Sequence, residues 1–328
     1  MQQRVLGTGG PKVSAIGLGC MGMSGAYGAA DHDESVATIR AALDAGINLL
    51  NTGDFYGMGH NESLVREAIQ GRRDQAFIAV KFGALRSPDG GWGGFDGRPA
   101  AMRNFLTYTL QRLGTDHVDL YQPARIDPTV PVEDTIGAIA DMVRAGHVRH
   151  IGLSEASAAT VRRAQKVHPI AALEIEYSLI DRDVETEVLP TLRELGIGLV
   201  AYGVLSRGLL GGDLKPGQNF APGDFRGHGP RFMPENLAQN HKMVEALASF
   251  AAERGVSAAQ VAIAWALSRG KDVIPLIGTK RRSRLAEAIA ASELTLGSDD
   301  LATLETIVRP DQVAGTRYAA PQMALLNG

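Results

Sequence analysis

Residues 47–82, INLLNTGDFYGMGHNESLVREAIQGRRDQAFIAVKF, contain two short apolar runs separated by a segment with helical periodicity. The runs at 47–51 and 76–82 have the length and apolar character of buried strands, and the segment at 60–70 is expected to form the helix between them. Strands and helices that alternate in this way are typical of βα units in a parallel sheet.

The same alternation extends in both directions from this unit. Strands are expected at 16–20, 47–51, 76–82, 118–121, 148–153, 171–175, 198–202 and 273–277. Helices are expected at 33–45, 60–70, 98–113, 132–145, 157–167, 184–195, 240–254 with 257–268, and 281–291. Eight strand–helix pairs predict a closed (β/α)8 TIM barrel, formed by a single domain over residues 1–328.

A doubly wound sheet is the rival architecture for alternating strands and helices. The stretch from Gly17 to Gly22, GLGCMG, matches the GxGxxG dinucleotide fingerprint by letter. That fingerprint also requires an acidic residue at the end of a second strand, where this chain has Asn51. The barrel is therefore the preferred prediction.

Three segments do not fit the alternation of strands and helices. The opening stretch turns at Gly9-Gly10-Pro11 and predicts a hairpin that plugs the barrel floor. Segments 83–98 and 211–236 are rich in glycine and carry aromatic residues, among them Trp92. Both follow strands, whose C-terminal ends carry the active sites of such barrels, so we expect lids over substrate or cofactor.

Composition excludes several classes of function. The chain is 45% hydrophobic and 21% charged, which suits one large globular core. A formal net charge of −3 provides no basic field for nucleic acid or an anionic membrane, so a small-molecule partner is favoured. The single cysteine, Cys20, cannot form an internal disulfide, and no apolar run reaches the length of a membrane span. We therefore expect a cytoplasmic protein.

Motifs along the whole chain resemble those of aldo-keto reductases. IGLGCMGMSGAYG, NTGDFYGMGHNE, FIAVKFG, DLYQPARIDP, HIGLSE, EIEYSLIDR, AYGVLSRGLL and IGTKRRSRL occur in the order seen in that family. The CMGMS and YGMGHNE stretches look like the bacterial and fungal branch that includes pyridoxal reductase-like proteins. The resemblance implies an NADPH-dependent oxidoreductase that reduces an aldehyde or ketone to an alcohol.

The resemblance also assigns a catalytic centre, and this chain departs from it at two positions. Tyr56 matches the family's general acid and Lys81 the lysine that stabilises the phenolate. Asn51 stands where the family has aspartate, so it can only be a neutral orienting group. Ala124 replaces the histidine and leaves room in a substrate pocket that Trp92 would help to cover.

Two other residues of this region could compensate for the replaced pair. Asp54 could supply the missing carboxylate, although it lies in the loop beyond the strand end. His60 is the histidine closest in sequence to the active loop, but a surface position at a helix start is the preferred interpretation. The histidines show no metal-binding spacing, so no metal site is expected.

The family's cofactor contacts carry over onto strand ends and the loops that follow them. Tyr202 matches the aromatic that stacks on nicotinamide, and the turn from Gly203 to Gly208 resembles the pyrophosphate loop, with glycine in place of its usual serine. Lys280 and Arg284 match the site of the adenosine 2′-phosphate. The predicted cofactor residues are Gly22, Met23, Ser154, Glu155, Glu174, Tyr202, Gly203, Val204, Leu205, Ser206, Arg207, Gly208, Ile277, Gly278, Thr279, Lys280, Arg284 and Glu287.

Three of these expectations rest on replaced residues. Glu155 and Glu174 stand where the family uses asparagine and glutamine to contact the carboxamide, and Ala288 replaces an adenine-contacting asparagine.

The lost aspartate and histidine keep a second function open, an NADP-binding sensor or regulatory subunit with little turnover. A barrel lyase or isomerase without nicotinamide is a third alternative. The physiological substrate stays open, because the lid loops that select it carry no identifying pattern. The reaction direction and the oligomeric state stay open as well.

Overall fold

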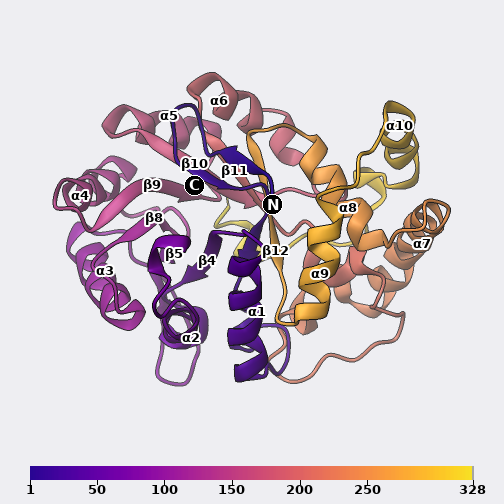
Figure 1. The fold of residues 1–328 in the computed structure, drawn as a ribbon, viewed down its shortest axis with the longest axis horizontal. Helices are drawn as coiled ribbons and strands as arrows, with labels where there is room; N and C mark the ends of the chain where they lie inside the picture. Colours follow the sequence, from indigo (N-terminus) through magenta and orange to yellow (C-terminus); the bar gives the residue numbers. More distant parts are fainter. Residues whose placement is uncertain (327–328) are drawn as a thin grey trace.

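Eight parallel strands close into a barrel in the computed structural model, which describes residues 1–326 (Figure 1). The strands are β3 (Gly17–Gly19), β4 (Leu49–Gly53), β5 (Phe77–Phe82), β8 (Val118–Pro123), β9 (Val148–Ser154), β10 (Ile170–Glu176), β11 (Gly198–Tyr202) and β12 (Val273–Gly278). They follow one another in chain order, and β12 pairs with β3 to close the ring. The predicted (β/α)8 barrel and its eight strands are confirmed.

A ring of helices surrounds the strands (Figure 1). These helices are α1 (His32–Asp44), α2 (His60–Ala68), α3 (Pro99–Leu113), α4 (Val132–Arg144), α5 (Ala158–Val167), α6 (Val188–Leu195), α7 (Pro234–Ala252), α8 (Ala258–Ser268) and α9 (Arg282–Ala291). Several begin at side-chain caps: Asp31 accepts a hydrogen bond from the Glu34 amide, and Ser257 forms a capping box with Gln260.

Helix α7 begins at Pro234, six residues before the predicted start at 240. Proline is favoured in the first turn of a helix, where its missing N–H costs nothing, so the helix extends back to it. Helices α10 (Ser298–Ile307) and α11 (Ala320–Met323) follow the barrel and were not predicted.

The barrel interior is filled by apolar side chains from six of the eight strands. Leu49, Phe77, Leu120, Ala172, Val200 and Ile274 form one buried cluster there. Leu6 and Val13 belong to the same cluster and come from the hairpin of β1 (Gln3–Val5) and β2 (Lys12–Ser14). The Ser14 amide donates to Asn48 Oδ1 at 2.7 Å, just before β4 begins, so the hairpin closes the N-terminal end of the barrel. The predicted plug is confirmed.

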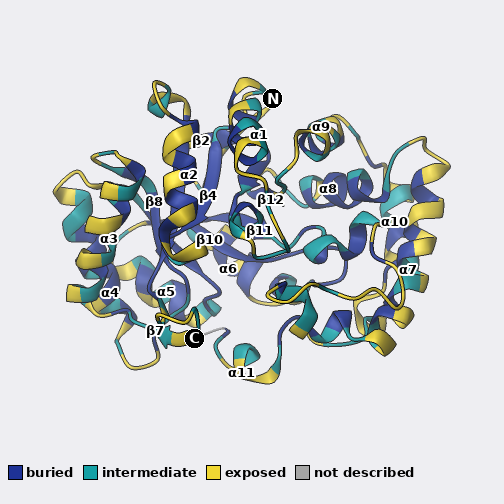
Figure 2. Ribbon diagram, turned by 90° about the horizontal axis from the view of Figure 1, so that it is seen from below, coloured by how far each residue is buried: buried dark blue, intermediate teal, exposed yellow. Residues whose placement is uncertain are grey.

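The opposite end of the barrel carries the long segments. A side view places β2 at one end of the molecule and β7 and α11 at the other (Figure 2). Segment 83–98 folds into a hairpin of β6 (Ala84–Arg86) and β7 (Trp92–Phe95), and segment 211–236 contains the short 3-10 helices η6 (Phe225–His228) and η7 (Pro230–Phe232). Trp92 is 47% exposed and packs against Phe95 and Arg86.

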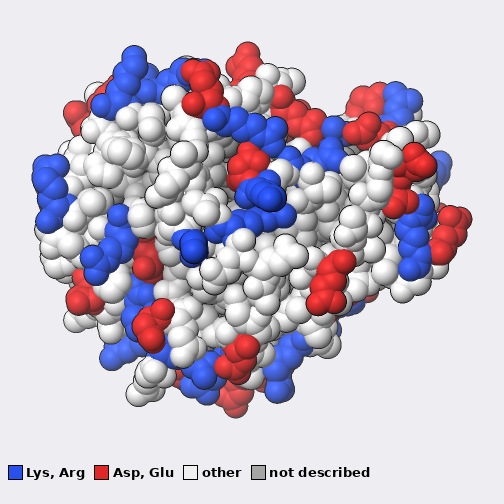
Figure 3. Space-filling model, turned by 45° about the horizontal axis from the view of Figure 1, so that its top comes forward, with Lys and Arg blue, Asp and Glu red and all other residues white. Residues whose placement is uncertain are grey.

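Charge is spread over the surface. On the face seen in Figure 3, acidic and basic side chains alternate between large neutral areas, in keeping with the net charge of −3. Within residues 1–326, no helix has the length and apolar character needed to cross a membrane.

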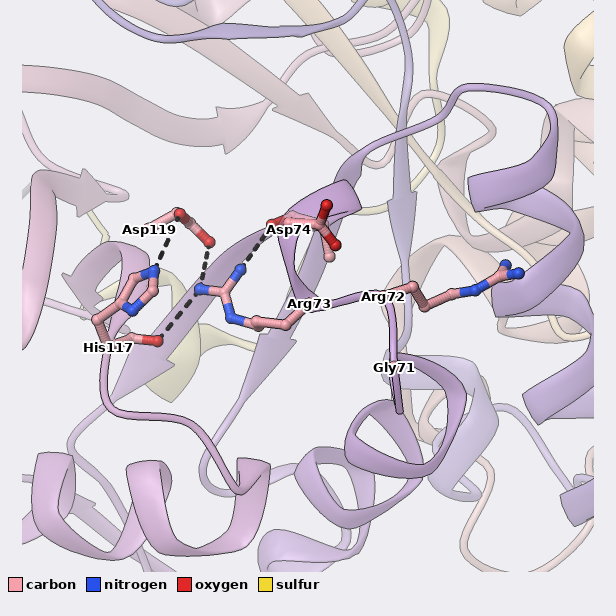
Figure 4. Close-up of a pocket in the computed structure, with 7 residues that line it drawn as sticks. Gly71, Arg72, Arg73, Asp74, His117 and Asp119 are labelled. Carbon is pink, nitrogen blue, oxygen red and sulfur yellow. Dashed lines mark hydrogen bonds and ion pairs between the residues drawn. The ribbon is translucent and has the colours of Figure 1, made fainter.

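A cavity of about 560 Å³ opens near the N-terminal ends of β5 and β8, away from the catalytic face of such barrels. Its wall is a clamp around Arg73, which donates to Asp119 Oδ2 at 2.7 Å and to the backbone carbonyl of His117 at 3.1 Å (Figure 4). Asp119 also accepts from the Ile78 amide at 2.8 Å. These bonds tie the strands together, so this cavity is a structural feature of the barrel floor.

Candidate active site

Four polar side chains from four strands meet inside the catalytic end of the barrel. Lys81 on β5 lies 2.9 and 3.2 Å from the two carboxylate oxygens of Glu174 on β10 and also donates to Asn51 Oδ1. Asn51 Nδ2 donates to Glu174 Oε2 at 2.7 Å, and Gln122 Nε2 donates to the same oxygen. All four residues are buried. The charge that position 51 lacks is therefore present, supplied by Glu174.

This arrangement differs from the role that the sequence suggested for Glu174. We predicted a contact to the cofactor carboxamide, whereas its carboxylate is directed to Lys81, Asn51 and Gln122. A buried carboxylate is stable only when it is paired and hydrogen-bonded, and the lysine and two amides meet that need.

Tyr56 lies at the start of the 3-10 helix η2 (Tyr56–Gly59), directly after the β4 strand and its short exit loop. The ammonium of Lys81 is 5.3 Å from the centre of its ring. Burial raises the pKa of the Tyr56 phenol well above its usual value, and the charge of Glu174 adds to this increase. The phenol is thus protonated at neutral pH, as a proton donor must be.

Asp54 and His60, considered as substitutes for the missing aspartate and histidine, are bonded to other partners. Asp54 accepts a long hydrogen bond from the Gly83 amide at 3.4 Å, and among residues 1–326 it forms no ion pair with Lys81. His60 is exposed, and its Nδ1 is 2.9 Å from Ser24 Oγ. Neither takes the place of the missing aspartate or histidine, and the sequence alternative that assigned Asp54 to Lys81 is wrong.

The buried Glu155 and the partly buried Tyr202 form a pair beside the C-terminal segment. The Tyr202 hydroxyl donates to Glu155 Oε1 at 2.6 Å and is 2.7 Å from the Tyr318 hydroxyl. Glu155 also forms an ion pair with Arg317 at 3.1 Å. Residues 317 and 318 thus reach from beyond the last barrel helix to two positions that the sequence assigned to the cofactor.

A second buried carboxylate explains the unusual glycine of the predicted pyrophosphate loop. Glu176 pairs with Arg207 at 2.9 Å and with Arg231 at 3.0 Å, and Arg231 also pairs with Asp181 at 2.8 Å. Gly203 has a φ of +70°, and a Cβ there would lie 3.0 Å from Glu176 Cγ. The family's serine would be strained and crowded at this position, so glycine is required.

The predicted adenosine end is already bonded within the protein. Lys280 donates to the carbonyls of residues 27–29, including Gly28 at 3.1 Å, and Arg284 pairs with Asp213 and, at 2.8 Å, with Glu287. Lys280 and Arg284 thus both have bonding partners within the protein. Backbone carbonyls accept the hydrogen bonds of Lys280, and two carboxylates neutralise Arg284.

Other residues of the site were missed in the sequence. Gln122 lies inside the quoted DLYQPARIDP motif, so its position at a strand end was a usable signal. Glu176 is two residues beyond Glu174 and therefore on the same face of β10, but it is nearer the strand end, where its partners are Arg207 and Arg231. Arg317 and Tyr318 follow the last predicted element, in a stretch with no periodic pattern.

Comparison with known proteins agrees with this geometry. The family model described as the aldo/keto reductase family matches residues 15–309. The glycerol dehydrogenase AKR11B4 from Gluconobacter oxydans is 28% identical with a TM-score of 0.84, over 94% of this chain and 96% of that one. The aldo-keto reductase AKR11C1 from Bacillus halodurans, solved as a holo form, is 26% identical with a TM-score of 0.76, over 94% and 97%.

A third similar structure is the thermostable aldo-keto reductase Tm1743 in complex with the inhibitor epalrestat, which is 27% identical with a TM-score of 0.75, over 94% of this chain and 100% of that one. The assignment to the pyridoxal reductase-like branch stays a prediction. The family model spans most of the barrel and its catalytic end, and on this ground the chain belongs to the aldo/keto reductase family.

Proposed function

We propose that this protein is an NADPH-dependent reductase that converts an aldehyde or ketone to an alcohol. The observation that carries the proposal is the buried ion pair of Lys81 with Glu174 beside the protonated Tyr56. Titratable groups whose pKa values are shifted by desolvation and by a charged neighbour are enriched at functional sites, and Tyr56 beside this ion pair is such a group.

The residues of the predicted pyrophosphate loop fit a bound dinucleotide. Ser206 Oγ and Arg207 Nη1 are buried and have no hydrogen-bond partner among residues 1–326. Ser206 and Arg207 also adopt positive φ angles of 44° and 56°. Non-glycine residues rarely accept this conformation, which is often found where backbone N–H groups are turned toward a ligand. Phosphate oxygens are acceptors that would satisfy these donors.

The chemistry divides between the cofactor and this chain. When bound, the dihydronicotinamide supplies a hydride to the carbonyl carbon. Tyr56 donates its proton to the carbonyl oxygen, which becomes the alcohol hydroxyl, and Lys81 stabilises the phenolate that remains. Glu174 and Asn51 hold the ammonium in position through their hydrogen bonds to it. The replaced aspartate is thus compensated from another strand.

A sensor that binds NADP with little turnover is the alternative. Ala124 favours it, because no imidazole is present there to polarise the carbonyl, whereas the intact Lys81–Glu174 pair favours catalysis. The test is a titration with NADPH followed by a panel of aldehydes and ketones, with NADPH absorbance as the readout. We expect consumption of NADPH with at least one carbonyl class. Tight binding without consumption by any of them would support the sensor.

A further inference from the structure

Arg125 is a cation at the catalytic end of the barrel that no carboxylate neutralises. It follows Ala124 directly after β8, and its Nη1 donates to the Ala124 carbonyl at 2.6 Å. Its guanidinium lies 5.9 Å from the centre of the Tyr318 ring. Within residues 1–326 it forms no ion pair.

The other buried cations around it are all paired. Lys81 pairs with Glu174, Arg207 and Arg231 share Glu176, Arg231 also binds Asp181, and Arg317 binds Glu155. This set holds five cations, counting Arg125, against four carboxylates. The excess positive charge belongs to Arg125. A partly buried guanidinium without a counter-ion keeps an uncompensated charge where solvent screening is reduced, so an anion that binds there is stabilised.

The guanidinium is on the reacting side of the site. It lies 5.9 Å from the centre of the Tyr318 ring, and the Tyr318 hydroxyl is 2.7 Å from the hydroxyl of Tyr202, the predicted nicotinamide-stacking residue. The positive charge of Arg125 also lowers the pKa of the Tyr56 and Tyr202 phenols, against the increase that burial causes. The methyl group of Ala124 stands where the family has an imidazole, so the next donor along the chain after β8 is Arg125.

The cofactor's own phosphates do not account for this cation. The predicted phosphate contacts follow β11 and β12, whereas Arg125 follows β8, whose neighbours in the barrel are β5 and β9. Arg207 lies nearer to that side, 4.6 Å from the Tyr318 ring, and is paired with Glu176. The anion that meets Arg125 is therefore part of the second ligand.

We propose that Arg125 binds a carboxylate of the substrate, and that the preferred substrates are aldehydes or ketones that carry one. This inference rests on the proposed reductase function and names its substrate class. One guanidinium presents two parallel N–H donors that match the two oxygens of a carboxylate. A phosphate monoester carries nearly two charges, and a single guanidinium would leave the second uncompensated.

The test compares 4-carboxybenzaldehyde with its methyl ester, which have the same shape at the reacting carbonyl. Charge-assisted hydrogen bonds contribute roughly 1.5–3 kcal/mol each, so kcat/KM should favour the acid by about tenfold or more in the wild type. In Arg125→Leu the ratio of acid to ester should fall at least tenfold. Arg103→Leu removes an exposed guanidinium from α3 and should leave the ratio unchanged. An unchanged ratio in Arg125→Leu would overturn the proposal.

Two further measurements separate the possible failures. If Arg125→Leu does not fold, Arg125→Lys keeps the charge without the paired donors, and its ratio should still fall several-fold; a wild-type ratio would count against the proposal. If neither compound is reduced by any variant, the reductase function fails, and calorimetric titration with terephthalate tests the anion site alone. Binding by the wild type that is lost in Arg125→Leu supports the site, and equal or absent binding contradicts it.

Discussion

The ammonium of Lys81 lies 2.9 Å from the carboxylate of Glu174, although the two residues stand on β5 and β10, which are not neighbours in the barrel. Their contact crosses the interior, where both side chains are only 5% exposed. The family's aspartate would meet the lysine from β4, the adjacent strand. In this protein the neutral Asn51 occupies that place, and the negative charge is supplied by Glu174 on β10.

Moving the carboxylate from position 174 to position 51 tests whether Glu174 replaces the family's aspartate as the counter-charge of Lys81. Glu174→Gln should destabilise the fold by about 3–5 kcal/mol, because it leaves the buried Lys81 ammonium without a counter-charge. It should also lower kcat, because the ammonium loses its fixed position. The double variant Asn51→Asp/Glu174→Gln returns the charge to β4 and should recover most of both losses. Thermal unfolding and steady-state kinetics measure the two effects.

Glu253→Gln makes the same change at an exposed side chain and gives the effect of the substitution itself. A double variant no better than Glu174→Gln would show that the carboxylate must come from β10. In that case Glu174 has a role beyond neutralising Lys81.

Cofactor selection should depend more on Lys280 than on Arg284. Lys280 is held only by backbone carbonyls, which a phosphate can replace, whereas Arg284 is shared between Asp213 and Glu287. Lys280→Ala should raise the Kd of NADPH about tenfold and leave that of NADH nearly unchanged, and Arg284→Ala should have a smaller effect. Fluorescence titration of both cofactors measures this.

The exposed Lys271 provides the control, because Lys271→Ala removes a positive charge elsewhere on the surface. Equal Kd values for NADPH and NADH in the wild type would remove the basis for placing the 2′-phosphate at Lys280.

Stability should depend on pH through Asp54. Burial, aided by the charge of Glu62, raises the pKa of its carboxyl from 3.8 to about 7. Between those values the folded protein binds the proton and the unfolded chain does not, so the free energy of unfolding falls as pH rises through this window and levels off above it. The full decrease is at most about 4 kcal/mol.

Asp54→Asn removes the titrating group and should flatten this part of the pH dependence, which makes the variant more stable than the wild type at pH values above the window. Urea unfolding across the window measures the difference. Asp183→Asn, the same substitution at an exposed position, gives the reference. The same slope in Asp54→Asn and in the wild type would assign the dependence to another group.

The barrel could be predicted from the sequence because each strand is an apolar run bounded by polar or glycine-rich loops, and each predicted strand overlaps an observed one. Tyr56, Lys81 and Asn51 could be selected because their motifs resemble those of aldo-keto reductases. The structure places Asn51 within β4, Lys81 near the end of β5 and Tyr56 just beyond β4, and their catalytic roles stay predictions. The start of α7 at Pro234 was missed because the preceding glycine- and proline-rich stretch hides a helix boundary.

The bonding partners of these residues could not be predicted. Which side chains meet across the barrel depends on the packed three-dimensional structure, and no local sequence pattern records it. Position 174 matches a cofactor contact in sequence, yet its carboxylate is drawn to the nearest buried cation, Lys81. Tyr318 reaches Tyr202 from the C-terminal segment, 116 residues away, and no local pattern records that contact.

The most direct test of the account is a single-turnover measurement of hydride transfer in the wild type and in Tyr56→Phe. The protein is loaded with NADPH, mixed with an excess of the best carbonyl substrate, and followed by the loss of nicotinamide absorbance. General acid catalysis contributes about 10²–10⁴-fold, so Tyr56→Phe should slow the transfer by that factor while its Kd for NADPH stays within about threefold of the wild type. Tyr108→Phe, at a half-exposed tyrosine of α3, should match the wild type. Transfer at a near-wild-type rate in Tyr56→Phe would mean that another group delivers the proton, and it would contradict the assignment of this site.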